Sequence, residues 1–316
     1  MAGARRAGRS GGGEITPLRL LMVCGVLLVL VLAALRFVPG SPFGTKAAAS
    51  WSEGGAAGDR PSAGAEAASR AERPTPAATS AAPSPLEIAP TDVKIDATGW
   101  WSWAMQDTRT GEIHGSSNMT RTSTTASLIK AWIGADFLRR SAEQDSTPSD
   151  ARLAQVSTMI RDSNNEAAQA LWQVVGESAS ITRLISTCGL TDSSAYKDLW
   201  SNTNLSARDI TRLGACIVSG KAAGPKWTDW LLDEMRQVRG TGDFGIRKAF
   251  PAAEQKSIAI KNGWVTRDAV GQWNVNCLAI GDGWTMGVMT VYPASLGYTY
   301  GANICKSVAQ QLRAAV

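Results

Sequence analysis

Apolar and polar positions alternate along several segments of the chain after residue 99, and such alternation predicts β-strands. A first strand is predicted over Trp100–Gln106, with a tight turn at Asp107–Gly111 and a hairpin partner over Glu112–Ser116. Further strands are predicted over Ser257–Val265, Gln272–Ile280 and Trp284–Tyr292. The predicted strands therefore form two groups that lie far apart in the sequence.

Between these groups apolar residues recur every three or four positions, which predicts helices. The sets are Leu128, Ile129, Trp132, Ile133, Phe137 and Leu138; Leu153, Val156, Met159 and Ile160; and Ala167, Ala168, Leu171, Val174 and Val175. Ser206 and Asp209 have the spacing of a capping box before Ile210. Two more helices are predicted, over Trp227–Met235 and on the face formed by Ile304, Val308 and Leu312. This order predicts an α+β fold whose sheet is split in the sequence.

The run from Leu20 to Leu35 contains no charged residue and is flanked by Arg19 and Arg36. It predicts a transmembrane anchor over residues 17–38, behind a basic cytoplasmic tail at residues 1–16, with everything that follows outside the cytoplasm. A cleaved signal peptide is the alternative. A lipid attached to Cys24 is disfavoured, because bulky Val23 precedes it and apolar residues follow it.

Residues 39–92 are rich in Ala, Ser, Pro, Gly and Glu and contain almost no large apolar residues. Such a composition cannot bury enough apolar surface to fold, so we expect a disordered linker. The folded domain is predicted to cover residues 93–316. The net charge of the whole chain is +5, and most of it lies before residue 39. The domain itself is therefore nearly neutral, which argues against a nucleic-acid partner.

Four cysteines, Cys188, Cys216, Cys277 and Cys305, lie in the part predicted to be exported. An even number in an oxidising compartment favours two disulfides. Three pairings are possible; we favour the sequential one, 188 with 216 and 277 with 305. Four buried thiols remain the alternative.

The only histidine, His114, lies in the first predicted hairpin, where we expect it at the surface. A Ser-His-Asp triad would have to use this residue, and a histidine-rich metal site cannot be built. Nucleophilic chemistry would thus need another base, and lysine is the obvious one. No metal or other cofactor is expected.

Three short motifs offer such chemistry. Ser127-Leu-Ile-Lys130 at the start of a predicted helix brings a hydroxyl and an amine to one helix face. Ser163-Asn-Asn165 falls between helices, and Lys261-Asn-Gly263 lies in a late strand. A second such spacing, Ser194 to Lys197, lies in a loop and shows that the first motif alone is weak evidence. In the order S-x-x-K, S-x-N, K-x-G, the three motifs together indicate one site.

With these motifs the chain resembles the class A β-lactamase and penicillin-binding serine hydrolase family, roughly from Gly99 to Leu312. The resemblance implies a five-stranded antiparallel sheet flanked by helices, an all-helical lobe, and a site between the two. It implies that Ser127 is the acylated nucleophile, that Lys130 accepts its proton, and that Ser163 relays the proton to the leaving nitrogen. For substrate binding it implies Asn165, Lys261, Asn262, Gly263 and Trp264, with the N–H groups of Ser127 and Trp264 as the oxyanion hole.

The sequence departs from the family pattern at three points. No glutamate lies between Gly189 and Asp209, where class A enzymes carry the residue that activates the deacylating water; Asp192 and Asp198 are the only carboxylates before Asp209. Asparagine stands at Asn164, where aspartate is usual, and at Asn262, where threonine or serine is usual. The missing glutamate predicts weak deacylation, and Asn262 removes a hydroxyl that in the family helps to bind the substrate carboxylate.

Two functions follow. The first is an extracytoplasmic serine hydrolase that is acylated at Ser127 by a β-lactam or a peptidoglycan-type peptide. The alternative is a non-catalytic domain that binds the same ligands as a sensor.

Overall fold

The computed structural model describes residues 85–195 and 199–316. The predicted cytoplasmic tail, the anchor and most of the predicted linker lie outside these residues, and so does Asp198. No helix within the described ranges combines the length and the hydropathy that a bilayer crossing requires.

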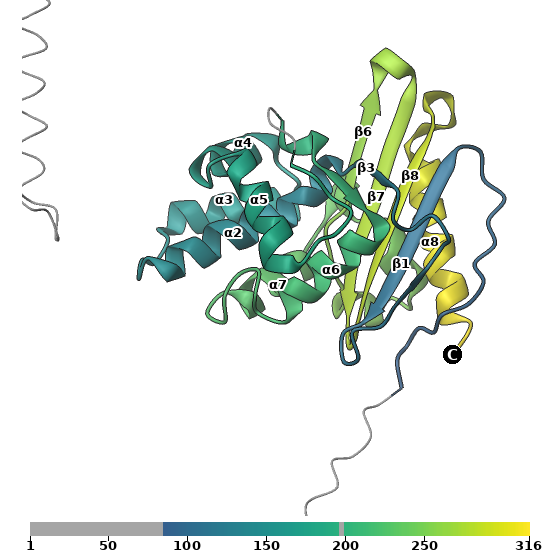
Figure 1. Cartoon of the computed structure of the whole chain (residues 1–316), viewed down its shortest axis with the longest axis horizontal. Helices are drawn as coiled ribbons and strands as arrows, with labels where there is room; N and C mark the ends of the chain where they lie inside the picture. Colours follow the sequence, from purple (N-terminus) through teal and green to yellow (C-terminus); the bar gives the residue numbers. More distant parts are fainter. Residues whose placement is uncertain (1–84, 196–198) are drawn as a thin grey trace, which may run out of the picture. The chain divides into compact units, whose positions relative to one another are not determined.

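One antiparallel sheet forms the centre of the domain, in the order β2-β1-β8-β7-β5, with β6 also paired to β7 (Figure 1). Its strands are β1 (Trp100–Asp107), β2 (Ile113–Gly115), β5 (Ala259–Ile260), β6 (Gly263–Arg267), β7 (Gln272–Gly281) and β8 (Trp284–Pro293). Strands β5 and β6 occupy the same edge position beside β7, so the sheet is five strands wide. The predicted split sheet is confirmed: β1 from the start of the domain pairs with β8 near its end.

Helices cover both faces of this sheet. The α6 helix (Ala207–Val218) packs on one face, where a side chain at Gly287 of β8 would meet Ile210 at 2.7 Å. The α8 helix (Gly297–Arg313) packs on the other face, where a side chain at Gly301 would meet Val275 of β7 at 2.7 Å. The predicted capping box at the start of α6 is confirmed in its first half, because the Ser206 hydroxyl accepts the N–H of Asp209 at 3.0 Å. The Asp209 carboxylate accepts from Thr191, Asp192 and Ser193 instead of the Ser206 N–H.

The remaining helices form the second lobe, to the left of the sheet in Figure 1. They are α2 (Lys130–Glu143), α3 (Asp150–Arg161), α4 (Asn165–Val174), α5 (Ser178–Cys188) and α7 (Thr228–Arg236). The predicted helices are confirmed, whereas α5 was not predicted. A small second sheet, β3 (Thr122–Thr124) paired with β4 (Asn204–Ser206), was not predicted either.

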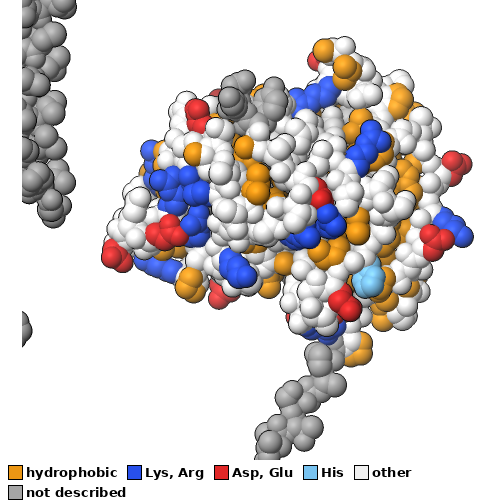
Figure 2. Space-filling model, in the orientation of Figure 1, with side chains coloured by type: hydrophobic (Ala, Val, Ile, Leu, Met, Phe, Trp, Pro, Cys, Tyr) orange, Lys and Arg blue, Asp and Glu red, His pale blue; other side chains and the backbone are white. Residues whose placement is uncertain are grey.

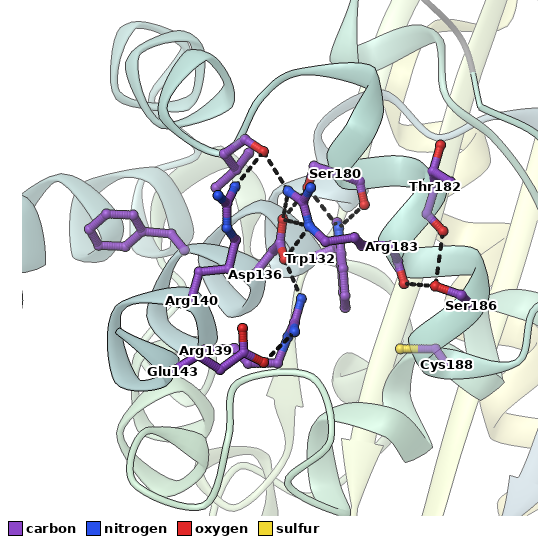
Figure 3. A network of polar contacts seen from close by, with 12 residues as sticks. Trp132, Asp136, Arg139, Arg140, Glu143, Ser180, Thr182, Arg183, Ser186 and Cys188 are labelled. Atoms are coloured by element: carbon purple, nitrogen blue, oxygen red, sulfur yellow. Dashed lines mark hydrogen bonds and ion pairs between the residues drawn. The ribbon is translucent and has the colours of Figure 1, made fainter. Parts of the chain in front are cut away.

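A buried polar network fastens α2 to α5 (Figure 3). Asp136 of α2 is fully buried and accepts hydrogen bonds from Arg139, Ser180 and Arg183. The Trp132 indole donates to both oxygens of Ser180 at 2.9 Å. Since α2 begins at Lys130, this network fixes the helix that carries one of the predicted site residues.

Both sequential disulfides are present, Cys188–Cys216 and Cys277–Cys305, as favoured from the sequence. The first joins α5 to α6, and the second joins β7 to α8. His114 is exposed at the surface (Figure 2).

The packed chain begins upstream of residue 93. Ile88 is 1% exposed, and Leu86 packs against the core. The N–H of Ala89 donates to the carbonyl of Leu312 in α8 at 2.9 Å. Residues 86–92, which we assigned to the linker, therefore lie against the domain, because Leu86 and Ile88 supply apolar side chains that pack on the core.

Candidate active site

Ser127 lies in a short 3-10 turn, η2 (Ala126–Ile129), that leads directly into α2. It is 9% exposed, and Ala126 before it has a left-handed φ of 49°. The neighbouring Leu128 N–H is bound by the Thr125 carbonyl at 3.2 Å. In contrast, neither the N–H nor the hydroxyl of Ser127 bonds to another described residue. The turn therefore presents a hydroxyl and a backbone donor that are both available to a ligand.

Lys130 follows one helical turn after Ser127 and is fully buried. Its Nζ donates to the Ser163 carbonyl at 2.6 Å and to the Asn165 Oδ1 at 2.8 Å, and lies 4.7 Å from the centre of the Trp200 ring. Burial lowers the pKa of Lys130 to about 7. No hydrogen bond joins Lys130 to Ser127. A large share of Lys130 is nevertheless neutral at physiological pH, which is what a general base requires.

Ser163 is the point at which the three motifs meet. Its hydroxyl accepts from Lys261 Nζ at 3.1 Å and from Lys130 Nζ at 3.4 Å. Ser163 has a left-handed φ of 56°, a conformation that costs energy for a residue other than glycine. Asn164 explains how this bend is held, because its side chain caps α4 by accepting the Ala167 N–H at 2.7 Å. The Asn164 side chain thus binds the backbone at the start of α4 and does not face the cleft.

Lys261 is also fully buried and donates a second hydrogen bond to the Asn262 carbonyl at 2.9 Å. Burial and the nearby charge of Lys130 hold the pKa of Lys261 well below its usual value. Within the described residues, neither lysine forms an ion pair with a carboxylate. A negatively charged ligand bound here would therefore stabilise the protonated forms of the two lysines.

The register of the edge strand tells which backbone groups are free. The N–H of Lys261 donates to the Leu278 carbonyl of β7 at 3.1 Å, so this position is a hydrogen-bonded pair. The same register continues to Gly263 opposite Asn276 and Trp264 opposite Val275. Hydrogen-bonded and non-hydrogen-bonded pairs alternate in antiparallel strands. The N–H of Trp264 therefore points away from β7, toward the open edge of the sheet, as an oxyanion-hole donor must.

Side chains on this strand alternate between two faces. Lys261 faces Ser163, whereas Asn262 faces the other way and donates to the carbonyls of Gly242 and Phe244 at 3.0 and 2.9 Å. The Asn262 amide is thus committed to a neighbouring loop rather than to the cleft. The Trp264 ring lies on the same face as Asn262, in edge-to-face contact with Phe244 and Tyr298.

Gly263 permits a close approach of backbone to backbone. A Cβ at this position would lie 2.2 Å from the Thr125 carbonyl oxygen and 2.8 Å from the Ser127 nitrogen. We expected the absence of a side chain to admit a ligand, but it is the Ser127 turn that occupies this space.

Several residues near Ser127 were not singled out from the sequence. Five of their polar atoms are buried and have no hydrogen-bond partner within the described part of the chain: Thr124 Oγ1, Thr125 Oγ1, Trp200 Nε1, Asn202 Oδ1 and Thr203 Oγ1. They lie in or beside β3, η2 and η3 (Trp200–Asn202), and the Thr125 N–H donates to the Thr203 carbonyl at 2.9 Å. Buried polar groups of this kind are where proteins hold internal water. These residues lie in loops and short strands without a regular apolar pattern, so the sequence did not indicate that they are near the site.

Two carboxylates after Gly189, Asp192 and Asp209, serve other contacts. Asp192 is paired with Arg208 and accepts the Ser206 hydroxyl at 2.7 Å. Asp209 accepts the Thr191 and Asp192 N–H groups and the Ser193 hydroxyl. Neither is free to activate water at Ser127.

Comparison with known proteins supports the fold described above. Solved structures similar to the domain include a β-lactamase from Chitinophaga pinensis (17% identity, TM-score 0.57, covering 69% of this chain and 94% of that one) and the TLA-3 extended-spectrum β-lactamase (14% identity, TM-score 0.57, covering 69% and 94%). These likenesses establish the fold, an α+β domain of the class A β-lactamase type.

Among curated proteins, "Putative lipoprotein LppW" from Mycobacterium bovis and from Mycobacterium tuberculosis is 28% identical over 169 residues. The match covers 52% of this chain and 54% of each relative, so the chain spans about half the length of the curated relatives it matches. A family model described as the beta-lactamase enzyme family matches residues 144–314. That range contains Ser163 and Lys261 but begins after Ser127 and Lys130, whose assignment rests on the geometry above. The chain belongs to the beta-lactamase enzyme family.

Proposed function

We propose that this protein is an extracytoplasmic serine hydrolase that is acylated at Ser127 by a β-lactam or a peptidoglycan-type peptide. The observation that carries this proposal is the convergence of Lys130 and Lys261 on the Ser163 hydroxyl, together with a Ser127 hydroxyl that bonds to no described residue. Two buried lysines without a described carboxylate partner would be costly in a purely structural module.

In the proposed first step, Ser127 Oγ attacks the acyl carbonyl carbon and transfers its proton to the neutral Lys130 Nζ. The developing oxyanion would accept hydrogen bonds from the backbone N–H groups of Ser127 and Trp264. As the carbonyl–nitrogen bond breaks, the proton would pass through the Ser163 hydroxyl to the leaving nitrogen. The product is an acyl ester on Ser127 and a free amine, which in a β-lactam stays attached through the opened ring.

In the proposed second step, water attacks the ester carbonyl and regenerates the Ser127 hydroxyl. The polar atoms of Trp200, Asn202 and Thr203 that have no partner among the described residues offer places to hold that water. Within the described residues, however, no carboxylate touches Lys130 or Ser163. We therefore expect deacylation to be slow and the acyl-enzyme to accumulate.

The domain would act outside the cytoplasm, held by an anchor at residues 17–38. The curated relatives carry the word lipoprotein in their name, which supports attachment to the cell envelope. Mass spectrometry of the N-terminal peptide from native membranes would distinguish an intact anchor from a cleaved signal peptide or a lipid on Cys24.

The test of the function is intact-protein mass spectrometry of the full chain before and after incubation with benzylpenicillin. A mass gain of one ligand that is lost in Ser127→Ala, but kept in the surface control Ser117→Ala, would support the proposal. Consumption of the drug that depends on Ser127, without an adduct, would also support it and would mean that deacylation is fast.

The second candidate is a sensor that binds the same ligands without reacting. The absence of a described water-activating carboxylate favours it. Reversible binding of benzylpenicillin by calorimetry, unchanged in Ser127→Ala and without adduct or consumption, would replace the first proposal by this one.

A further inference from the structure

Arg267 lies on the same face of the edge strand as the candidate site. Lys261 and Gly263 face Ser163 and the Ser127 turn, and side chains two residues apart on a strand share a face. Val265 and Arg267 therefore follow on that face. The Arg267 guanidinium reaches across to the Ser201 carbonyl at 3.2 Å, so it bridges β6 and η3 at one end of the site.

The charge of Arg267 has no described counter-charge. The side chain is half-buried, and burial lowers its pKa. It donates to a backbone carbonyl and forms no ion pair with any described carboxylate. The nearest carboxylate in the sequence, Asp268, is exposed. A guanidinium has five N–H donors, and the bond to the Ser201 carbonyl is the one contact that the described residues make with them. A partly desolvated cation without an ion pair among the described residues is suited to bind an anion.

Its position along the strand defines where that anion would sit. Successive strand residues advance by about 3.3 Å, so Arg267 lies roughly 13 Å along the strand from Gly263. Lys261 lies on the same face but before Gly263, in the other direction along the strand. An acyl chain bonded to Ser127 and laid along the free edge of β6 would extend toward the guanidinium, since the outward N–H of Trp264 marks the same edge.

We propose that Arg267 selects substrates whose acyl group carries a carboxylate at its far end, several bonds from the reacting carbonyl. This inference rests on the proposed function and names the class of its substrate: an anionic acyl donor held between the nucleophile and Arg267. Lys261 precedes Gly263 along the chain and Arg267 follows it, so the two cations would contact different parts of one substrate.

The test uses the purified full chain and two thiophenyl esters, of N-adipoylglycine and of its neutral amide, in which a carboxamide replaces the distal carboxylate. Thiophenol release gives kcat/KM for each. A charged hydrogen bond predicts that the wild type prefers the carboxylate by on the order of tenfold. In Arg267→Gln that preference is expected to fall to about one, with kcat/KM for the neutral ester within about twofold of wild type, which also shows that the variant is folded.

Arg236→Gln is the control, because Arg236 also donates to a backbone carbonyl, that of Ser257, although it is ion-paired with Asp233 as well. It should keep the wild-type preference. Equal use of both esters by the wild type, or an unchanged preference in Arg267→Gln, would overturn the assignment of Arg267 alone. If neither ester releases thiophenol in a Ser127-dependent reaction, the proposed function fails and the Arg267 assignment fails with it.

Discussion

Gly263 and Thr125 are so close that one additional carbon on Gly263 would lie 2.2 Å from the Thr125 carbonyl oxygen. The edge strand and the Ser127 turn are therefore packed backbone against backbone, and the geometry of the nucleophile depends on the strand beside it. This dependence gives the first prediction.

Gly263→Ala should displace the Ser127 turn, because a contact of 2.2 Å cannot be accommodated without a backbone shift. Loss of one oxyanion donor typically costs on the order of 100-fold in rate, and we expect a loss of that order in the acylation of Ser127 by benzylpenicillin. Gly242→Ala is the control, since its nearest contact would be an ordinary 3.4 Å to Val238. Equal rates in the two variants would contradict the close packing described here.

The acylation rate should rise as the pH passes upward through about 7, where Lys130 loses its proton and becomes a base. The measurement is the rate of adduct formation between pH 5 and 9, followed by quenched mass spectrometry. Lys130→Arg should be inactive across this range, because guanidinium does not deprotonate. A rate that is flat between pH 6 and 8 would argue against Lys130 as the base.

The ionisation of Lys130 should also change the free energy of unfolding with pH, in a direction that can be predicted. The pKa of Lys130 is lowered on folding, from 10.5 to about 7. Between these values the unfolded chain binds more protons than the folded one, so the free energy of unfolding rises with pH. The cost of burying Lys130 is therefore fully present below pH 7 and is relieved above it. Compared with Lys130→Met in urea titrations, the wild type should gain stability from pH 7 to pH 9.

Trp200→Ala should raise the pKa of Lys130, because the ring that covers its amine is replaced by water. The acid limb of the pH–rate profile is then expected to move to higher pH. Trp200→Phe keeps an aromatic face over the amine and should leave the limb close to its wild-type position. A limb that moves equally in both variants would assign the effect to the indole N–H instead.

The two disulfides should differ in their resistance to reduction. Cys277 and Cys305 are both 0% exposed, whereas Cys188 is half-buried. A reductant under native conditions should therefore open Cys188–Cys216 first, and alkylation with peptide mapping would show the order. Each bridge closes a loop of 28 residues, for which loop-closure entropy predicts roughly 3–4 kcal/mol of stabilisation. Reduction of both should lower the midpoint of thermal unfolding well below that of the oxidised protein.

The sequence was sufficient to predict the elements in which apolar residues recur with a regular period. Strands β1, β7 and β8 and helices α2, α3, α4 and α6 are long enough for apolar periodicity to reveal them. The α5 helix was missed because Ser178, Ala179 and Ser180 begin it with small and polar residues, and a glutamate with a left-handed φ of 52°, Glu177, stands at its N-cap. The β3–β4 pair was missed because strands of three residues carry no period.

For the site, the residue types and their order brought Lys130, Ser163, Asn165 and Lys261 into one hypothesis, and the structure places them in contact. The orientation of Asn262 could not be predicted, because it depends on which phase of the strand faces the helical lobe. Trp200 and Arg267 contribute through positions fixed only by the tertiary fold. The local pattern of apolar and polar residues does not predict contacts between segments that lie far apart in the sequence.

The uninterrupted register from Ala259 to Arg267 has an evolutionary consequence. A single inserted or deleted residue in this segment would exchange the two faces of the strand. Lys261 would leave Ser163, and the face of Asn262 would turn toward the nucleophile instead. Descendants of this chain can thus alter the chemistry of the segment by substitution, while length changes must be confined to the hairpin beyond Arg267. Among descendants, the length of this segment should therefore vary less than its amino-acid sequence.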